Sequence, residues 1–350
     1  MPEIGLLGLS KLKIISVFFV VIFTTSLHSQ KYPDSTVHSL LTKGINFVID
    51  EEFEHAEKVF LTLQQYDKNL PIADIYIAGT EIAKSFDLKL PYNEKKIFFH
   101  LNRAKSTSKK MMEREPDNPW AIYFLALGEG YSAYYSAIKG SWLPAFSEGL
   151  NSFNNFERCL RMDSTFSDAL IAIGSYKYWK SRKTNFLNWL PFFQDEEDYG
   201  IELLKTSIVS QTYNKHLAYN SLIWIYIDRK QFRNAISLTE IVLKEHPNSR
   251  FFKWSYARAV EEFDYEKANN VYTDILNSLD KKQEGYRINF IVLQHKIAQN
   301  LIKMNKLKEA QKILKNLLSI KNLSIYEKER LGDRIERVKT HLTKVEKKLK

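Results

Sequence analysis

The chain has 350 residues, of which 44% are hydrophobic and 13% aromatic, and it carries a formal net charge of +10 with a single cysteine, Cys159. The apolar content excludes a disordered chain, and one thiol excludes an internal disulfide framework. Glycine and proline are scarce, at 12 and 9 residues, which favours helices over a sheet-rich fold. Residues 299–350 hold 15 Lys and Arg against 6 Asp and Glu, so a basic C-terminal segment follows a near-neutral body.

The first 29 residues are typical of a secretory signal peptide. Lys11 and Lys13 precede the apolar run 14–23, and small polar residues follow that run. The run is shorter than the roughly 20 apolar residues that a membrane-spanning helix needs. We therefore expect cleavage after Ser29 and an exported protein, either periplasmic or attached to the cell envelope. An uncleaved membrane anchor is the alternative.

Residues 30–320 contain a recurring pattern of two amphipathic helices. The pattern has a large residue, a small residue and an aromatic residue on the first helix, then Ala and a second large residue on the second helix. The first unit of this pattern contains Leu40, Gly44, Phe47, Ala56 and Phe60, and it ends at Pro71. Six further units follow, with their small residues at Gly79, Gly128, Gly174, Ala235, Ala268 and Ala310. Small residues suit positions where helices cross closely, and large ones fill the gaps between repeats.

The third and fourth units are longer than the others, because extra residues lie between their two helices. One insert contains Trp142-Leu143-Pro144, and the other contains Trp189-Leu190-Pro191. Insertions at equivalent places usually lie on one face of a repeat array. We therefore expect two tryptophan-containing loops on the same face.

The last segment, 321–350, is predicted to be one basic helix that starts at Ser324, with Glu327 completing a capping box. Its apolar residues recur at alternating spacings of four and three and make a single seam that covers the last repeat. A coiled-coil dimer is the alternative, although fewer than four heptads are present. A basic flank beside the seam is formed by Arg330, Arg334, Arg337, His341, Lys344 and Lys348.

The best-formed unit, 216–248, has Tyr219, Leu222 and Tyr226 on its first helix and ends at Pro247. Together with the spacing of the other units, it resembles the tetratricopeptide repeat family over roughly residues 36–320. The resemblance implies an all-α right-handed superhelix of about seven helix pairs with a C-terminal capping helix, and a non-catalytic role in binding proteins. The middle of the chain has an aromatic, proline-containing insert, then the segment Asp195–Leu204, then the strong repeat with His246-Pro247-Asn248. In this order of segments it is also similar to the eukaryotic tetratricopeptide family that includes the inclusion-body clearance protein of fungal mitochondria.

The sequence supports no catalytic constellation. It contains no nucleotide-binding glycine loop, no zinc-protease motif and no paired cysteines. Cys159 occupies a small buried position of the repeat, and the acidic run 195–198 begins a helix, where negative charge suits the dipole. The eight histidines are scattered, so we predict no metal site and no cofactor.

The first helix of each pair is expected to line a concave groove that binds a protein or an extended peptide. By repeat register, Tyr178, Trp179, Asn220 and Trp224 face this groove and are the predicted contacts. The alternative is a peripheral envelope protein that touches anionic lipid. The predicted lipid contacts are Trp142, Trp189, Arg334, Arg337, Lys344 and Lys348. We expect no nucleic-acid partner for an exported protein, and the oligomeric state stays open.

Overall fold

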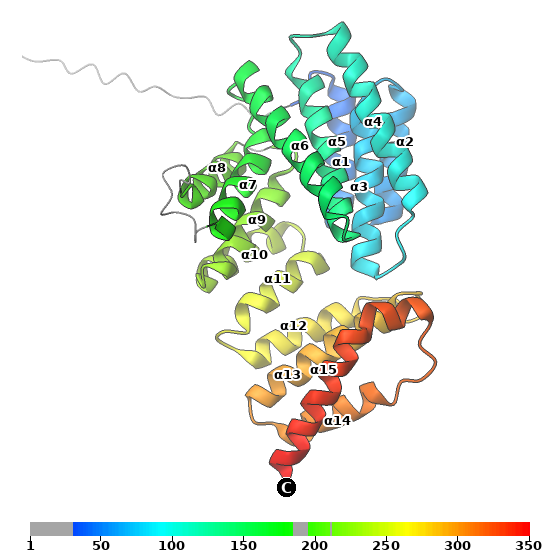
Figure 1. The fold of residues 1–350 in the computed structure, drawn as a ribbon, viewed down its shortest axis with the longest axis vertical. Coiled ribbons are helices and arrows are strands. Elements are labelled where there is room, and N and C mark those ends of the chain that lie inside the picture. The colour runs from blue at the N-terminus through cyan, green and yellow to red at the C-terminus, as the bar shows by residue number, and fades with distance from the viewer. Residues whose placement is uncertain (1–30, 185–194, 211) are drawn as a thin grey trace, which may run out of the picture.

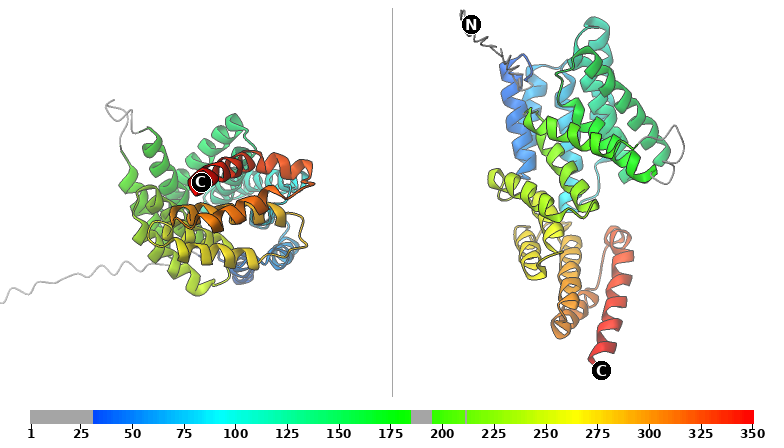
Figure 2. Two further views of the ribbon diagram at one scale, coloured as in Figure 1. Left: turned by 90° about the horizontal axis from the view of Figure 1, so that it is seen from below. Right: turned by 90° about the vertical axis from the view of Figure 1, so that its left-hand side faces the viewer.

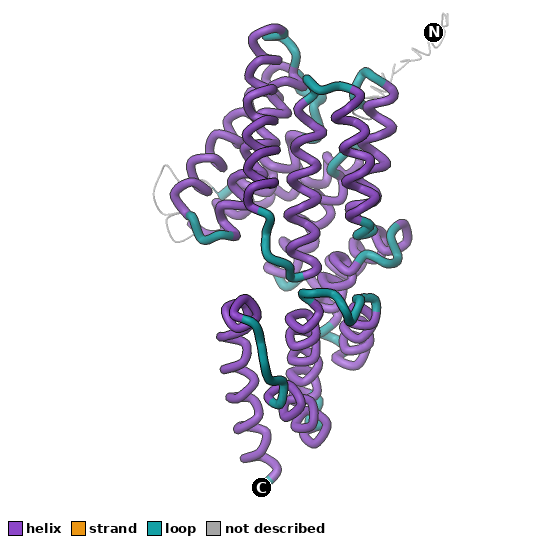
Figure 3. The backbone as a smooth tube through the Cα atoms, turned by 90° about the vertical axis from the view of Figure 1, so that its right-hand side faces the viewer, coloured by secondary structure: helices purple, strands orange, loops and turns teal. Residues whose placement is uncertain are grey.

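The computed structural model describes residues 31–184, 195–210 and 212–350, and all regular structure in these residues is α-helical (Figure 1). The predicted signal peptide, 1–29, and the second Trp-Leu-Pro triplet, 189–191, lie outside the described residues. Fifteen helices follow one another in the described part of the chain, and the tube in Figure 3 shows short connections between most of them. The fold class is therefore the predicted one, an all-α array.

The helices of the first four pairs are α1 Ser35–Ile49, α2 Phe53–Tyr66, α3 Pro71–Leu88, α4 Glu94–Arg114, α5 Pro119–Ile138, α6 Trp142–Met162, α7 Ala169–Thr184 and α8 Glu197–Val209. The remaining helices are α9 Lys215–Asp228, α10 Phe232–Glu245, α11 Arg250–Val260, α12 Tyr265–Asn277, α13 Tyr286–Lys303, α14 Leu307–Leu318 and α15 Ile325–Leu349. Each helix packs on the next one in the chain, so the repeats expected from the sequence are seven helical hairpins followed by α15.

The two helices of a pair have different surroundings. The odd-numbered, inner helices contact one another between pairs, as α3 does with α5, α7 with α9, and α13 with α15. In α3, 12 of 18 residues are buried, which means that this helix is covered on nearly every side. In α10 only Ala235, Thr239 and Val242 of 14 residues are buried, so this outer helix keeps one face in water.

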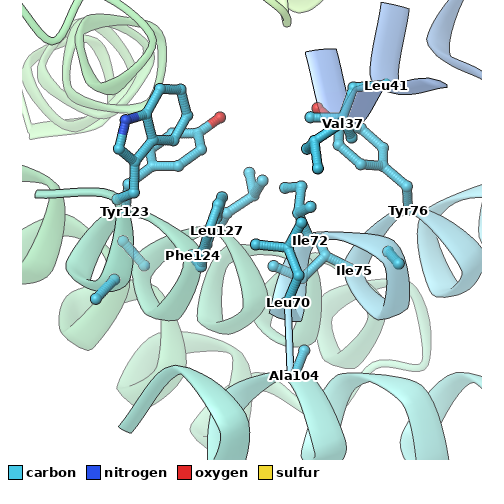
Figure 4. Packing of buried hydrophobic residues seen from close by; sticks show 14 of the residues in the cluster. Val37, Leu41, Leu70, Ile72, Ile75, Tyr76, Ala104, Tyr123, Phe124 and Leu127 are labelled. Carbon is cyan, nitrogen blue, oxygen red and sulfur yellow. The ribbon is translucent and has the colours of Figure 1, made fainter. Parts of the chain in front are cut away.

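Small residues at the predicted positions allow close helix crossings. A Cβ atom on Gly174 would lie 2.7 Å from the carbonyl oxygen of Gly200, and one on Gly200 would lie 2.6 Å from that of Gly174. These two glycines therefore let α7 and α8 approach through their backbones. Ala56 and Phe60 are fully buried in the first pair, and Figure 4 shows the neighbouring core where α1, α3, α4 and α5 meet.

The C-terminal helix begins as the sequence indicates. The Ser324 hydroxyl accepts a hydrogen bond from the Glu327 backbone N–H at 3.2 Å, and the Glu327 carboxylate accepts one from the Ser324 N–H at 2.7 Å. Leu331, Val338 and Val345 are buried against α13 and α14. The apolar seam thus covers the end of the array.

The first Trp-Leu-Pro triplet is not a loop, contrary to the sequence-based expectation. Trp142, Leu143 and Pro144 form the first turn of α6, because Pro is well tolerated there, where the backbone N–H has no helical partner. The extra length of the third unit comes from two long helices, α5 and α6. No helix in the described ranges is both long and apolar enough to cross a membrane.

The array winds tightly enough for its first helices to lie against its middle ones. The backbone N–H of Tyr32 donates to the Tyr213 hydroxyl at 2.9 Å, and His38 Nδ1 lies 2.6 Å from the same oxygen. Figure 2 shows the blue first helices beside the green middle helices. Tyr213, just before α9, therefore lies against the first helix pair.

A second closing contact joins the α1–α2 turn to the start of α11. The Glu51 carboxylate accepts hydrogen bonds from the backbone N–H groups of Arg250 at 3.0 Å and Phe251 at 2.8 Å. These are free N–H groups of the first turn of α11, and Ser249 at its N-cap supplies no side-chain cap. A side chain about 200 positions earlier thus caps this helix. Burial and the nearby Asp87 raise the pKa of Glu51 to about 7, although Arg250 opposes the shift.

The end of α3 completes the closure. The Arg250 guanidinium contacts the Asp87 carboxylate, with Nη2 2.5 Å from Oδ2, and the Asn289 amide donates to the Asp87 carbonyl at 2.9 Å. A Cβ atom on Gly285 would lie 1.7 Å from the Leu88 carbonyl oxygen. Only glycine permits this approach of α13 to α3.

Candidate functional site on the inner surface

Tyr178, one of the predicted groove residues, is fully buried. Its hydroxyl donates to Asp228 Oδ2 at 2.8 Å, and the Arg229 guanidinium lies 5.3 Å from the ring centre. Burial, together with Asp228, raises the pKa of this hydroxyl to about 12. Tyr178 therefore packs inside the fold, and the prediction that it faces an open groove is wrong.

The other three predicted groove residues are partly exposed. Trp179 packs against the core cluster of α7, α8 and α9. Asn220 and Trp224 lie four residues apart and so share one face of α9. Among the described residues, the Asn220 side-chain oxygen is buried without a hydrogen-bond partner. Asn220 and Trp224 thus share a partly exposed face of α9, on which the Asn220 side-chain oxygen itself is buried.

The inner side of α3 and α5 is occupied by the chain itself. The Tyr76 hydroxyl donates to the Asn214 side-chain oxygen at 3.0 Å, and the Asn214 amide donates to the Tyr123 hydroxyl at 2.9 Å. Asp168 accepts hydrogen bonds from the backbone N–H groups of Tyr213 and Asn214. All of these groups except the half-buried Tyr213 are buried, and burial raises the pKa of Asp168 to about 6. This network fills the inner side of α3 and α5 around Tyr76 and Tyr123.

The basic side chains on one flank of α15 make no ion pair with any carboxylate among the described residues. We define the cationic face as Lys89, at the end of α3, with Arg330, Arg334, Arg337, His341 and Lys344 of α15; none of these residues makes an ion pair within the described ranges. Burial lowers the pKa of Lys89 to about 8, and Arg330 and Arg334 lower it further against the opposing charge of Asp87. Burial and the charge of Arg337 likewise lower the pKa of Arg334.

His295 of α13 lies beneath this face and is fully buried. Its Nε2 is 2.9 Å from Nδ1 of His341, while its Nδ1 is buried without a hydrogen-bond partner in the described part of the chain. Burial, followed by the charges of Arg334, His341, Arg337 and Lys296, lowers the pKa of His295 to about 3. The imidazole is therefore neutral at neutral pH, since another positive charge is strongly disfavoured here.

Exposed aromatic and aliphatic side chains gather where α3 and α5 end and α4 and α6 begin. These four ends meet because consecutive helices run in opposite directions. Tyr134, Trp142, Leu143 and Phe146 are 50%, 72%, 85% and 71% exposed, and we name these four the aromatic end. The nearby Tyr92 has a pKa of about 12, which burial and Tyr134 raise and the charge of Arg330 lowers. Tyr92 therefore connects the aromatic end to the cationic face.

Cys159 and the acidic residues at the start of α8 have surroundings that suit packing. Cys159 is buried as expected, and burial raises the pKa of its thiol to about 12, so it has little thiolate at neutral pH. The acidic residues Glu197 and Asp198 form ion pairs with Arg229, at 2.7 and 2.6 Å. These ion pairs join α8 to the end of α9.

The sequential packing of these helix pairs defines an all-α solenoid of tetratricopeptide type. No family model and no curated protein matches the sequence. Nothing in these comparisons therefore supports the narrower resemblance to the family of the fungal clearance protein.

Solved structures with similar folds include several tetratricopeptide proteins. A thermophilic tetratricopeptide protein of Thermus thermophilus has 13% identity and a TM-score of 0.39, over 64% of this chain and 98% of its own. Yeast Tom70 has 10% identity and a TM-score of 0.38, over 84% of this chain and 87% of its own. Human IFIT1, described as a dimer with m7Gppp-AAAA, has 13% identity and a TM-score of 0.43, over 83% of this chain but only 63% of its own. These scores are too low to transfer any function.

Proposed function

We propose that this protein is an exported, non-catalytic scaffold that binds an acidic segment of a protein partner on its inner surface, at the cationic face. The observation that carries the proposal is the set of unpaired cations on α15 and at the end of α3. Asn220 and Trp224 of α9 are a second proposed contact, for an apolar or aromatic part of the same partner.

Several partly buried cations elsewhere in the molecule are paired with carboxylates, in contrast to the partly buried cations of the cationic face. Lys96 contacts Glu57 at 2.7 Å and Glu81 at 2.9 Å, and Glu261 receives both Lys296 and Arg258. On α15, in contrast, Arg334 is partly buried beside Arg337, and neither of them makes an ion pair within the described ranges. Burying like charges together is unfavourable unless an anion binds there, and a carboxylate-rich segment would relieve that repulsion.

Trp224 supports the proposal from a second place on the inner surface. Its ring is partly exposed and belongs to none of the core clusters. Aromatic side chains supply large, rigid contact areas at protein interfaces. A partner that passes from α9 to α15 would cross adjacent inner helices spaced roughly 9 Å apart, so about eight extended residues would span them.

Export rests on the sequence of residues 1–29, with their basic start and short apolar run. N-terminal sequencing of the protein recovered from the cell envelope tests it. A first residue at Gln30 supports cleavage, and an intact N-terminus recovered with the membrane supports the retained anchor.

The binding test uses two charge-reversal variants that change the net charge equally. Arg334→Glu/Arg337→Glu reverses two cations of the cationic face. Lys328→Glu/Lys339→Glu reverses two exposed cations on the other side of the apolar seam of α15. Each protein serves as bait in affinity purification from the native envelope, with mass spectrometry of the recovered partners. We expect the first variant to lose its partner and the control to keep it; equal recovery by folded proteins overturns the proposal.

A second function is favoured by one observation, the exposure of Trp142, Leu143 and Phe146 at the start of α6. Trp is favoured at membrane interfaces, and the basic residues Arg334, Arg337, Lys344 and Lys348 would suit anionic headgroups. Co-sedimentation with vesicles that contain phosphatidylglycerol tests this function. Binding that falls with salt and is lost in Trp142→Ala/Phe146→Ala supports a peripheral envelope protein; no binding supports the protein partner alone.

A further inference from the structure

Three potential metal ligands meet beside the contact between the first and fifth helix pairs. His216 lies in the first turn of α9, Glu245 is the last residue of α10, and His246 follows it. One ligand atom from each residue lies within 4.8 Å of the other two. Both imidazoles are buried, at 7% and 6% exposure, and the carboxylate reaches them from the surface.

The hydrogen bonds in this cluster leave nitrogen atoms free to bind a metal. His246 donates its Nδ1–H to Asp50 Oδ1 at 2.8 Å, which fixes the ring and leaves Nε2 as its metal-binding atom. A carboxylate that holds the other nitrogen is the usual companion of a metal-ligating histidine. Nδ1 of His216 is buried and has no hydrogen-bond partner within the described ranges. A buried nitrogen without a partner is costly, and a metal ion would satisfy it.

We propose that His216, Glu245 and His246 bind one divalent transition-metal ion of the Zn²⁺ type, with Asp50 orienting His246. Two imidazoles and a carboxylate form a ligand set that suits zinc and leaves a fourth position for water. Glu245 now contacts Lys215 at 3.1 Å, an exposed pair that contributes little stability and can be exchanged for the metal.

The ion would fasten the closed part of the superhelix. His216 and His246 join α9 to the end of α10, and Asp50 belongs to the α1–α2 turn of the first pair. Metal binding would therefore stabilise the contact between the first and fifth pairs, through a link that the sequence spacing does not reveal. His216 and His246 are 30 positions apart, and they meet because the start of α9 and the end of α10 lie at the same end of an antiparallel hairpin.

The test is titration of the purified, metal-free protein with Co²⁺, whose visible absorption reports coordination by imidazole, followed by competition with Zn²⁺. We expect one Co²⁺ per chain, displacement by Zn²⁺ and a higher Tm with metal. Glu245→Gln, an exposed change that leaves the fold intact, should weaken binding about 10-fold or more, and Asp50→Asn about 10- to 100-fold. His246→Gln should abolish it.

Two control variants separate this site from the other histidines. His55→Ala removes an exposed histidine that contacts Glu52 at 2.8 Å without a second imidazole, and it should bind Co²⁺ normally. His341→Ala disrupts the His295–His341 pair and should also bind normally. Absence of a stoichiometric Co²⁺ complex in the unaltered protein overturns the proposal. So does a complex that survives in His246→Gln and Glu245→Gln, or one that disappears in His341→Ala.

Discussion

The inner helices at the two ends of the array have opposite surroundings. Around α3 and α5, other segments of the chain cover the inner side, and the Tyr76–Asn214–Tyr123 network satisfies the polar groups there. At α15 the flank beside the apolar seam has no such cover, and its arginines have no carboxylate within ion-pair distance in the residues that the structure describes. One repeating unit thus gives a closed core at one end and a charged, accessible surface at the other.

This difference shows how an open array becomes partly closed. A helix pair has an apolar inner face that its neighbours cover only in part, so the remainder must meet either a partner or another part of the chain. Here the superhelix brings the α8–α9 and α10–α11 turns onto the first pairs. The proposed partner-binding surface therefore lies on the later helices.

Arg250→Ala should have the largest effect on the closed region. The Arg250 side chain is 15% exposed and neutralises Asp87 and Glu51, which are 16% and 3% exposed. Its removal leaves two buried carboxylates without a cation, which costs about 3–5 kcal/mol, although the backbone N–H groups at the start of α11 still bind Glu51. Urea denaturation followed by circular dichroism measures the loss.

The matched control for Arg250→Ala is Lys205→Ala, which removes a cation from an exposed ion pair with Glu202. Such a pair contributes about 0–1 kcal/mol, so this variant should unfold almost like the unaltered protein. Equal effects of the two changes would mean that the closing contact does not stabilise the fold.

Gly285→Ala should disrupt the contact between α13 and the end of α3, where the closed region meets the later helices. The added Cβ would lie 1.7 Å from the Leu88 carbonyl oxygen, so α13 must move away from α3, at a cost of about 1–3 kcal/mol or more. Gly332→Ala on α15 meets nothing within 4 Å and should instead stabilise the protein by up to about 1 kcal/mol, through better helix propensity. Thermal unfolding of both variants should show Tm changes of opposite sign.

Acid should weaken the docking of α15 through His295. The pKa of this buried imidazole is about 3, while that of an unfolded histidine is about 6.5, so the unfolded state takes up a proton first as the pH falls. Stability that is fully present above pH 7 is therefore lost between about pH 6.5 and 3, amounting to about 2 kcal/mol at pH 5 from this one residue.

The groups that face His295 are Lys296 of its own helix and Arg334, Arg337 and His341 of α15. His295→Gln removes the titrating group. Urea unfolding at pH 7.5 and pH 5.0 should show a smaller pH dependence for this variant than for the unaltered protein. An identical pH dependence would exclude His295 as a source of acid sensitivity.

The periodicity of the sequence predicted the helix pairs and the capping box, because both depend on residues close together in the chain. Gly174 marked a close crossing, and Ser324 with Glu327 marked the start of α15. The prediction for Tyr178 was wrong because the repeat register indicates which way a side chain points. It does not indicate whether Asp228 and Arg229 cover that side chain.

Local sequence patterns could not predict the contacts that join the first helix pair to the later helices. Glu51 caps α11 from about 200 positions away, and no local pattern records how tightly a superhelix winds. The basic flank of α15 could be read from its spacing. That it lacks carboxylate partners, and that Lys89 of α3 joins it, required the structure.

Amide hydrogen exchange of the free protein tests the contrast between the two regions most directly, since it reports how often each helix opens. We predict the slowest exchange in α3 and α5, and in the first turn of α11, where Glu51 accepts from Arg250 and Phe251. The outer side of α15 should exchange faster. Exchange in α3 and α5 as fast as in α15 would contradict the account, because it would show that the inner side of the first pairs is open to water.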